Sequence, residues 1–331
     1  MAIITYREAI RQALREMLKD ERVFLMGEDI GAYGGAFAVT KGFFDEYGDK
    51  RIRDTPIAES VIVGAGIGAV MTGARPIVEV MTINFTLLAF DNIVNHAAKI
   101  HLMSGGQVNI PLIIRTVTGS GNQLGAQHSQ NIEGHYAMVP GLKVVSPATP
   151  ADAKGLLLAA YDDKNPVLFV EHFALYNSKG EVPEDPVRVP LGQAAIVRPG
   201  TDITLITYSR MTQYCLKAAE ILAGQGVSAE VIDLRTLRPL DFDTMRASIR
   251  RTHHVVVVEE AAKGTSIGGD IISELQESAY ADLHAPVYWI AGAPVPIPYN
   301  KSLERQVIPS PESVAEAVLR LCGEYTCAAE G

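Results

Sequence analysis

Residues 76–117 read PIVEVMTINFTLLAFDNIVNHAAKIHLMSGGQVNIPLIIRTV, and in this stretch two short apolar runs flank a segment of helical length. The runs PIVEVM (76–81) and PLIIRTV (111–117) predict strands buried on both faces, and residues 85–103 predict a helix between them. Parallel strands need such a crossover, and repeated strand–helix–strand units build a doubly wound α/β sheet. The stretch therefore predicts this fold class.

The same alternation extends towards both ends of the chain. Thr5 and Glu8 form a capping box that predicts the start of a first helix. Further apolar runs predict strands at VFLMGE (23–28), LKVVSP (142–147) and VLFVEH (167–172), and helical patterns occupy 59–73 and 150–161.

A proline-rich polar stretch interrupts this rhythm near residues 175–200, and a second α/β series follows it. That series predicts strands at 202–209, 229–235, 254–260 and 287–292, with helices at 212–225, 241–251, 268–281 and 311–322. We therefore expect one doubly wound domain at 1–178, a linker at 179–200 and a second doubly wound domain at 201–331.

Composition narrows the class of protein. The chain has 331 residues, of which 47% are hydrophobic and 20% charged, with a formal net charge of −9. This balance is typical of a folded α/β protein and argues against nucleic-acid binding, which favours a basic face. The first residues, MAIITYREAI, lack a signal-peptide pattern, and no apolar run reaches the length of a membrane span. We expect a cytoplasmic protein without membrane or nucleic-acid partners.

The most informative chemical segment is DTPIAESVIVGAGIGAVMTG (54–73), in which Glu59 stands among apolar residues. A carboxylate in such a setting is unfavourable unless it is paired or neutral. Taken alone, Glu59 is either a functional acid or a helix-start residue stabilised by the helix dipole. The glycines that follow lack the G-x-G-x-x-G spacing of a dinucleotide-binding turn; because they lie within a predicted helix, close packing against another backbone would explain them.

Two other residues follow predicted strands, where ligands gather in α/β folds. Phe85 comes directly after the strand at 76–81 and is either a core residue or a ligand contact. His128 lies in the glycine-rich loop GSGNQLGAQHSQ (119–130) and is either solvated or catalytic.

The amino-acid sequences of many segments, and their order along the chain, resemble those of the β subunits of the decarboxylating first component of 2-oxo acid dehydrogenase complexes, of the pyruvate and acetoin type. The resemblance covers nearly the whole chain. The matching strings are GEDIGAYGGAFAVTKG (27–42), DKRIRDTPIAES (49–60), MTINF (81–85), MSGG (103–106), AQHSQ (126–130), PGLKVVSP (140–147), DAKGLL (152–157), KNPVLFVEH (164–172), EVIDLRTLRPLD (230–241) and VPIPYNKSLE (295–304).

The resemblance implies a transketolase-like architecture, with a pyrimidine-binding domain followed by a transketolase C-terminal-like domain. It implies an oxidoreductase of the pyruvate dehydrogenase (acetyl-transferring) type that uses thiamine diphosphate and Mg²⁺. In such enzymes an α subunit holds the diphosphate and Mg²⁺ through a GDG motif. This chain has no GDG, since neither Gly48-Asp49 nor Gly269-Asp270 is followed by glycine. We therefore expect an α₂β₂ heterotetramer that acylates the lipoyl domain of a dihydrolipoyl acyltransferase, docked through the C-terminal domain.

The resemblance also implies roles for individual residues. Glu59 matches the acid that activates the cofactor through its pyrimidine ring, and Phe85 and Ile57 match apolar contacts of that ring. His128 matches an acid/base or orienting histidine at the mouth of the active site, and Glu28 an acid that relays protons. Leu88, a further cofactor-side position, stands where some pyruvate-type chains carry glutamine.

Some family members bind a structural potassium ion in the β subunit, mainly through backbone carbonyls. The matching positions are Leu112, Ala160, Tyr161, Asp163 and Asn165. Oxygen-only ligands suit a hard cation.

Other functions remain open at this level. The same scaffold serves acetoin dehydrogenases and branched-chain 2-oxo acid dehydrogenases. A chain that only docks the acyltransferase and a nicotinamide-dependent dehydrogenase are competitors from other classes. Loss of activity on changing Glu59 to Gln would exclude a purely docking role, and stoichiometric NADH binding would favour a nicotinamide enzyme.

Overall fold

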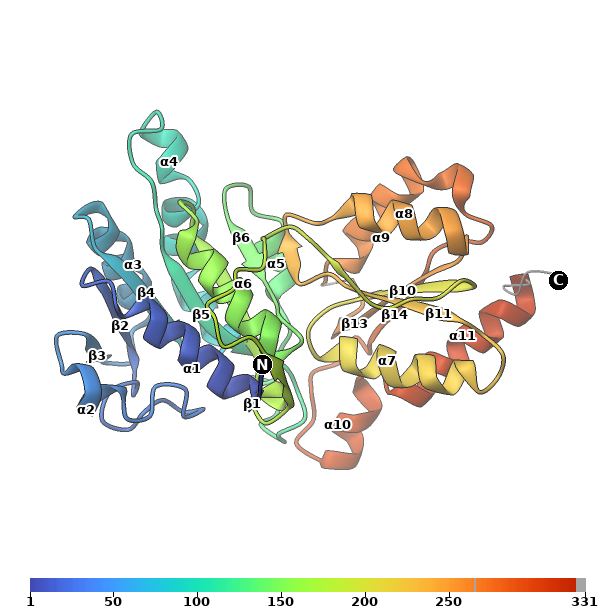
Figure 1. Cartoon of the computed structure of the whole chain (residues 1–331), viewed down its shortest axis with the longest axis horizontal. Helices are drawn as coiled ribbons and strands as arrows, with labels where there is room; N and C mark the ends of the chain where they lie inside the picture. The colour runs from blue at the N-terminus through green and yellow to red at the C-terminus, as the bar shows by residue number, and fades with distance from the viewer. Residues whose placement is uncertain (265, 326–331) are drawn as a thin grey trace. The chain divides into compact units, whose positions relative to one another are not determined.

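The computed structural model describes residues 1–264 and 266–325 (Figure 1). Contacts within the chain divide it into two compact units. The first unit comprises residues 1–119 and 135–191, and the second comprises 120–134 and 192–331. The segment 120–134 thus belongs by its contacts to the second unit although the first unit surrounds it in sequence.

The first unit is built on a parallel sheet whose strand order is β6-β7-β5-β4-β2-β3. The strands are β2 (Val23–Glu28), β3 (Ile52–Thr55), β4 (Arg75–Val80), β5 (Ile113–Thr118), β6 (Lys143–Val145) and β7 (Val167–His172). Of the five strand runs expected from the sequence, four differ from the observed strands by at most two residues at either end. The fifth run, at 142–147, shortens to the three residues of β6. Strand β3 was not expected, because only one of its four residues, IRDT, is buried.

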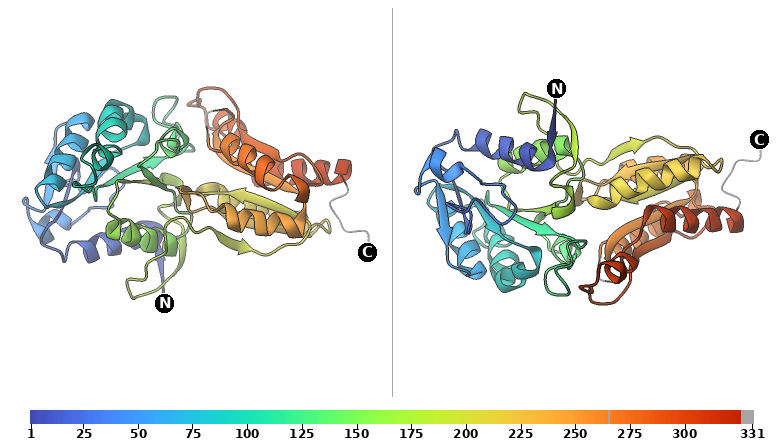
Figure 2. Two further views of the ribbon diagram at one scale, coloured as in Figure 1. Left: turned by 90° about the horizontal axis from the view of Figure 1, so that it is seen from above. Right: turned by 90° about the horizontal axis from the view of Figure 1, so that it is seen from below.

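Helices cover both faces of this sheet (Figure 2). Helices α1 (Tyr6–Met17) and α6 (Pro150–Asp162) pack against each other on one face. Helix α3 (Glu59–Met71) packs on β4 from the other face. The hydroxyl of Thr5 accepts the Glu8 backbone N–H at 3.1 Å, so the predicted start of α1 is confirmed.

The single helix expected at 85–103 is wrong. The chain forms a 3₁₀-helix η1 (Ile83–Ala89), a π-helix η2 (Asn92–Ala97) and a short α4 (Ile100–Met103). In η1 the buried residues Ile83, Thr86 and Ala89 recur every three positions, which matches the three residues per turn of a 3₁₀-helix. This spacing gathers buried side chains of η1 into one narrow stripe, and η1 packs on α3. The apolar side chains of Leu87 and Leu88 stay exposed.

The remaining elements of the first unit are short. Strands β1 (Ala2–Thr5) and β8 (Lys179–Val182) form an antiparallel ribbon, and the short helices are α2 (Phe43–Tyr47) and η3 (Phe173–Leu175). Helix α5 (Glu133–Ala137) contains the point where the chain passes between the units.

A buried ion cluster fastens the central strands of the first unit. The Arg115 guanidinium on β5 lies 2.6 Å from Glu79 on β4 and 2.7 Å from Glu171 on β7. Tyr176 also donates to Glu171 at 2.7 Å. Burial acts to lower the pKa of Arg115, but the two carboxylates outweigh it and hold that pKa above its usual value. Arginine therefore stays charged between β4 and β7.

The second unit has a five-stranded sheet in the order β14-β13-β10-β11-β9, in which only β9 runs antiparallel to its neighbour. Its strands are β9 (Ala195–Arg198), β10 (Ile203–Thr207), β11 (Ala229–Asp233), β13 (Val255–Ala262) and β14 (Tyr288–Gly292). Helices α7 (Arg210–Ala223) and α11 (Pro311–Tyr325) pack together on one face, and α8 (Phe242–Thr252) and α9 (Gly268–Ser278) cover the other (Figure 1). Short elements complete the unit: β12 (Thr236–Arg238), η4 (Tyr280–Asp282) and α10 (Lys301–Val307).

The prediction of two doubly wound α/β units is confirmed. The stretch 179–200, expected as a linker, contains ordered structure: β8 pairs with β1 in the first unit, and β9 pairs with β11 in the second. Pro183, Pro186 and Pro190 lie between these strands, and Pro199 follows β9. The polar composition reflects short edge strands with few buried side chains.

Candidate active site

The strand order of the first unit places a switch point at β2. The chain passes from β2 to β3 on one side of it and then to β4 on the other side. In open α/β sheets, ligands bind beyond the carboxyl ends of the strands at such a point. Glu28 is the last residue of β2 and is paired with Thr55, the last residue of β3. The segment after β4 leads directly into η1, which carries Phe85.

Glu59 is the first residue of α3, only four positions after the end of β3. Its side chain is buried, with 6% of the residue exposed. Within the described parts of the chain, no backbone or side-chain donor bonds its carboxylate. The helix N-terminus favours a negative charge there, and the carboxylate oxygens are not fully enclosed by the chain. Glu59 can therefore accept a hydrogen bond from a ligand.

Glu28 is half-buried and lies close enough to Glu59 for the two carboxyl groups to interact electrostatically. Burial, followed by the negative charges of Asp29 and Glu59, raises the pKa of the Glu28 carboxyl above its ordinary value. The structure thus brings two of the predicted site residues together. Carboxyl groups coupled in this way are common where proteins handle protons.

The predicted apolar contacts of the site lie on or beside α3. The 3₁₀-helix η1 packs on α3, and its Phe85 is half-buried. Ile57 is 73% exposed and Leu88 63% exposed. Both side chains stand outside the core of this chain and are open to a ligand or another protein.

The glycines of α3 do not pack as expected. A Cβ on Gly66 would lie 2.8 Å from Cγ1 of Val78, so the close neighbour is a side chain of β4 instead of another backbone. A Cβ on Gly68 would meet nothing within 4 Å. Gly66 therefore lets α3 approach the sheet, whereas Gly68 lies on the outer face of the helix.

Sequence reasoning missed Asp54, which shapes the loop after Glu28. Its Oδ1 accepts the Gly31 backbone N–H at 2.6 Å. A Cβ at Gly31 would lie 2.3 Å from an Asp54 carboxylate oxygen, so a larger residue there would displace the carboxylate. The only trace in the sequence is that both residues fall inside the strings GEDIGAYGG and RIRDTPIAES.

His128 belongs to the second unit, in the segment 120–134. Its side chain is exposed, and its backbone N–H donates to the Gly125 carbonyl at 3.4 Å. Sequence reasoning treated this segment as a loop of the first domain. Its anchors, Glu260 and Glu304, lie 140 and 183 residues away from the groups they bind.

The residues expected at a potassium site converge in one corner of the first unit. The Leu112 carbonyl accepts the Val167 N–H at 2.9 Å, and the Ala160 carbonyl accepts the Asp163 N–H at 3.3 Å. Each carbonyl keeps a second lone pair for a cation. Arg75 donates to the Tyr161 carbonyl.

Asp163 sits within the same corner and already has partners. Its Oδ1 accepts two hydrogen bonds from Asn165, both at 2.9 Å, and Lys143 pairs with its other oxygen. Burial acts to raise the pKa of Asp163, but these donors outweigh it and lower that pKa. Two protein cations, Arg75 and Lys143, therefore share the corner with any bound ion.

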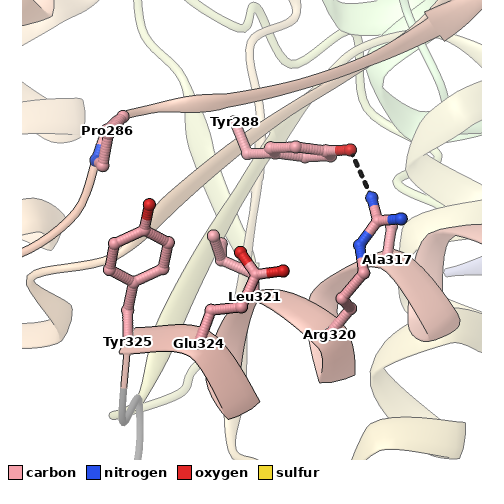
Figure 3. Close-up of a pocket in the computed structure, with 7 residues that line it drawn as sticks. All are labelled: Pro286, Tyr288, Ala317, Arg320, Leu321, Glu324 and Tyr325. Carbon is pink, nitrogen blue, oxygen red and sulfur yellow. Dashed lines mark hydrogen bonds between the residues drawn. The ribbon is translucent and has the colours of Figure 1, made fainter.

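Other candidate features lie apart from these residues. Among the described residues, no three His, Cys, Asp or Glu side chains cluster as a metal site. Across residues 1–264 and 266–325, no helix is both long enough and apolar enough to cross a bilayer. A cavity of about 220 Å³ in the second unit is lined by α11 and the start of β14, where Arg320 donates to the Tyr288 hydroxyl at 2.6 Å (Figure 3). It contains none of the predicted site residues.

Comparison with known proteins accounts for this arrangement. Residues 2–179 match the transketolase pyrimidine-binding domain, and residues 192–314 match the transketolase C-terminal domain. The chain is 46% identical over 312 residues to a protein of Porphyra purpurea named pyruvate dehydrogenase E1 component subunit beta, covering 94% of each chain. The chain belongs to the pyruvate dehydrogenase E1 β-subunit family.

Further relatives carry the same name. One from Rickettsia felis is 45% identical over 320 residues, which cover 96% of this chain and 98% of that protein. A mitochondrial β-1 subunit from rice is 46% identical over 324 residues, covering 96% of this chain and 87% of that protein. A split-gene transketolase structure aligns with a TM-score of 0.78 at 22% identity, over 97% of this chain and 99% of that one. The family resemblance and the transketolase-like fold are therefore confirmed.

We predict that Glu59→Gln lowers the pKa of Glu28, because the substitution removes one of the negative charges that raise it. A pH titration of ¹³C-labelled glutamate side chains by NMR measures this shift. An unchanged Glu28 pKa in the variant would show that the two carboxyls are not coupled.

The same shift has a consequence for stability. An acid whose pKa is higher in the folded state binds its proton more tightly there, so its contribution is complete at low pH. That contribution is lost as pH rises from the ordinary glutamate pKa to the raised value. Unfolding of the wild type should therefore show this fall in stability relative to Glu28→Gln, and the opposite slope would contradict the assignment.

Proposed function

We propose that the chain is the β subunit of a thiamine-diphosphate-dependent dehydrogenase that decarboxylates pyruvate and transfers the acetyl group to a lipoyl group. The observation that carries the proposal is the buried Glu59 carboxylate at the switch point, without a donor in the described chain. Identities of about 45% over nearly the full chain to E1 β subunits support the substrate.

Glu59 fits the aminopyrimidine half of the cofactor. A ring nitrogen that carries a proton would supply the hydrogen bond that the carboxylate lacks. When bound, thiamine diphosphate supplies a nucleophilic carbon and an electron sink for decarboxylation. Glu59 would share a proton with the pyrimidine ring and so set its tautomer, while burial excludes competing water.

The other predicted site residues would divide the remaining tasks. Phe85 would pack on the pyrimidine ring from η1, with Ile57 and Leu88 as further apolar contacts of the ligand. The pKa of Glu28 is raised, so this carboxyl group stays protonated to a higher pH than an ordinary glutamate does. Glu28 would pass protons towards Glu59. The exposed His128 would act as acid/base or orienting group when the acyl group is transferred to lipoyl.

We propose that an α subunit completes the site and holds the diphosphate and Mg²⁺, in an α₂β₂ heterotetramer. The chain itself has no GDG motif. In addition, apolar side chains around α3 are exposed where a single chain would be expected to bury them. They are Ile57 (73%), Val61 (67%), Leu87 (51%) and Leu88 (63%). An exposed apolar patch of this kind is typical of a protein interface.

Partners beyond the α subunit follow from the same family relation. We propose that the C-terminal domain, expected at 201–331, docks a dihydrolipoyl acyltransferase whose lipoyl domain accepts the acyl group. We keep cytoplasmic location as a proposal, since one relative comes from Rickettsia and another is named as mitochondrial. Fractionation of the source cells tests the location.

Glu59→Gln should reduce pyruvate decarboxylation at least about a hundredfold in the reconstituted enzyme, because the amide cannot share a proton with the cofactor. The measurement is turnover of pyruvate with an artificial electron acceptor. Glu21→Gln, at an exposed position of the same unit, is the matched control and should behave as wild type. Full turnover by the Glu59 variant would contradict the catalytic role of Glu59 and favour a docking role for the chain. Turnover of acetoin in place of pyruvate would show that acetoin is the substrate.

Val61→Glu should weaken assembly with the α subunit about a hundredfold or more, because an unpaired charge would be buried in the interface. Native mass spectrometry or size-exclusion chromatography of the mixture measures this. Val187→Glu is the matched control, since Val187 is also in the first unit and is 51% exposed. Equal assembly of both variants would show that the α3 surface does not bind the partner.

We further propose that a potassium ion binds the carbonyls of Leu112, Ala160 and Tyr161 with Asp163 and Asn165. A ligand that binds only the folded state stabilises it. The thermal midpoint should then be higher in KCl than in NaCl at equal ionic strength, and Asp163→Asn should remove the difference. Equal midpoints for the wild type in both salts would reject the site.

A further inference from the structure

The second unit has its own switch point, and the segment 120–134 is bound beside it. From β10 the chain goes to β11 on one side and later to β13 on the other. This is where doubly wound domains usually bind ligands. Here the groups that follow β10 and lie near the end of β13 bind the chain's own segment 120–134 instead.

The first anchor holds Ser120. The Glu260 carboxylate, at the end of β13, accepts both the backbone N–H and the hydroxyl of Ser120 at 2.8 Å. Arg210, the first residue of α7, donates to the Ser120 carbonyl at 2.9 Å and lies 3.6 Å from Glu260. All polar groups of Ser120 are thus bound by one ion pair.

The second anchor is Glu304 on α10, which is only 1% exposed. Its Oε1 accepts the Gly121 N–H at 2.6 Å, and the Gln123 N–H lies 3.3 Å from each of its oxygens. The backbone is left-handed at both positions, with φ of 111° at Gly121 and 57° at Gln123. The carboxylate satisfies backbone N–H groups at both positions, which stabilises this conformation of the loop.

The far end of the segment is fastened as well. Tyr208, which follows β10, donates to Glu133 at 3.3 Å. Gly134 lies against the backbone of Ser266, since a Cβ there would be 3.0 Å from the Ser266 Cα. His128 therefore lies between two fixed ends of one short segment.

These anchors do not serve to bury the segment. Residues 121–124 are exposed, and so is His128. Two buried carboxylates thus bind the backbone of a loop that adds little to the core of the unit. What they fix is the path of the loop, and hence the place from which the histidine is presented.

We propose that Glu304, together with Glu260, is a positioning residue that sets the conformation of the 120–134 loop for reaction at His128. The proposal rests on the function assigned above to His128, and it adds residues from the second unit to the reaction. Neither carboxylate contacts the substrate in this account. They act through the loop groups that they bind, which are backbone N–H groups and the Ser120 hydroxyl.

The test compares Glu304→Leu with Glu304→Gln in the reconstituted complex. Leucine removes both acceptor oxygens, whereas glutamine keeps one carbonyl acceptor at nearly the same place. Glu304→Leu should lower the rate of lipoyl acylation about tenfold, because small displacements of a reacting group reduce rates steeply. The loss should be greater for acylation than for decarboxylation with an artificial acceptor. Glu304→Gln should recover part of it, and Glu316→Leu, at an exposed position of α11, is the matched control.

A double-mutant cycle separates positioning from general damage. In a His128→Ala background, Glu304→Leu should cause no further loss of acylation. An equal loss in both backgrounds would overturn the proposal, as would a normal rate for Glu304→Leu when His128→Ala is impaired. Full acylation by His128→Ala would instead refute the role of the histidine itself. Thermal unfolding identifies a misfolded leucine variant, in which case the glutamine variant carries the same comparison.

Discussion

The placement of one acid, Glu59, beside the switch point of the sheet is the feature on which the candidate site of the first unit depends. Glu59 is placed at the start of α3 by the short connection from β3, and 6% of it is exposed. The N-terminus of α3 favours a negative charge at this position, and the carboxylate oxygens are not fully enclosed by the chain. Within the described residues nothing else contacts the carboxylate as a donor. The carboxylate can therefore accept a hydrogen bond from a ligand, and the family to which the chain belongs uses thiamine diphosphate.

The residues around Glu59 are arranged in keeping with its place at the start of α3. Glu28 lies near Glu59 because β2 and β3 are paired to their last residues. Burial, then the charge of Asp29 and then that of Glu59, raise the pKa of Glu28. Gly66 brings α3 close to β4, so that the helix start stays at the switch point. The buried Arg115 cluster ties β4, β5 and β7 together beneath it. Local packing, electrostatics and site geometry therefore point to the same place.

Much of the fold could be predicted from the sequence because buried parallel strands appear as apolar runs. The runs at 23–28 and 167–172 became strands with those bounds. The conformation of the segment 85–103 could not be predicted. The three-residue spacing of buried side chains in η1 becomes apparent only once η1 packs on α3. Edge strands such as β3 and β8 bury few side chains and leave almost no pattern.

The site was harder to predict than the fold. From its own neighbours, Glu59 was as consistent with a structural helix start as with an active-site acid. The family resemblance favours the acid, and this role stays a prediction. Glu260 and Glu304 gave no local signal, because each binds a backbone N–H in a loop far away in sequence.

The central claim is that this chain provides only part of a cofactor site. Calorimetric titration of thiamine diphosphate with Mg²⁺ into this chain, its α subunit and their mixture tests it most directly. The account predicts binding by the mixture and none by this chain alone, with weaker binding when Glu59 is replaced by alanine. Stoichiometric binding by this chain alone, or equal affinity in the Glu59→Ala mixture, would contradict it.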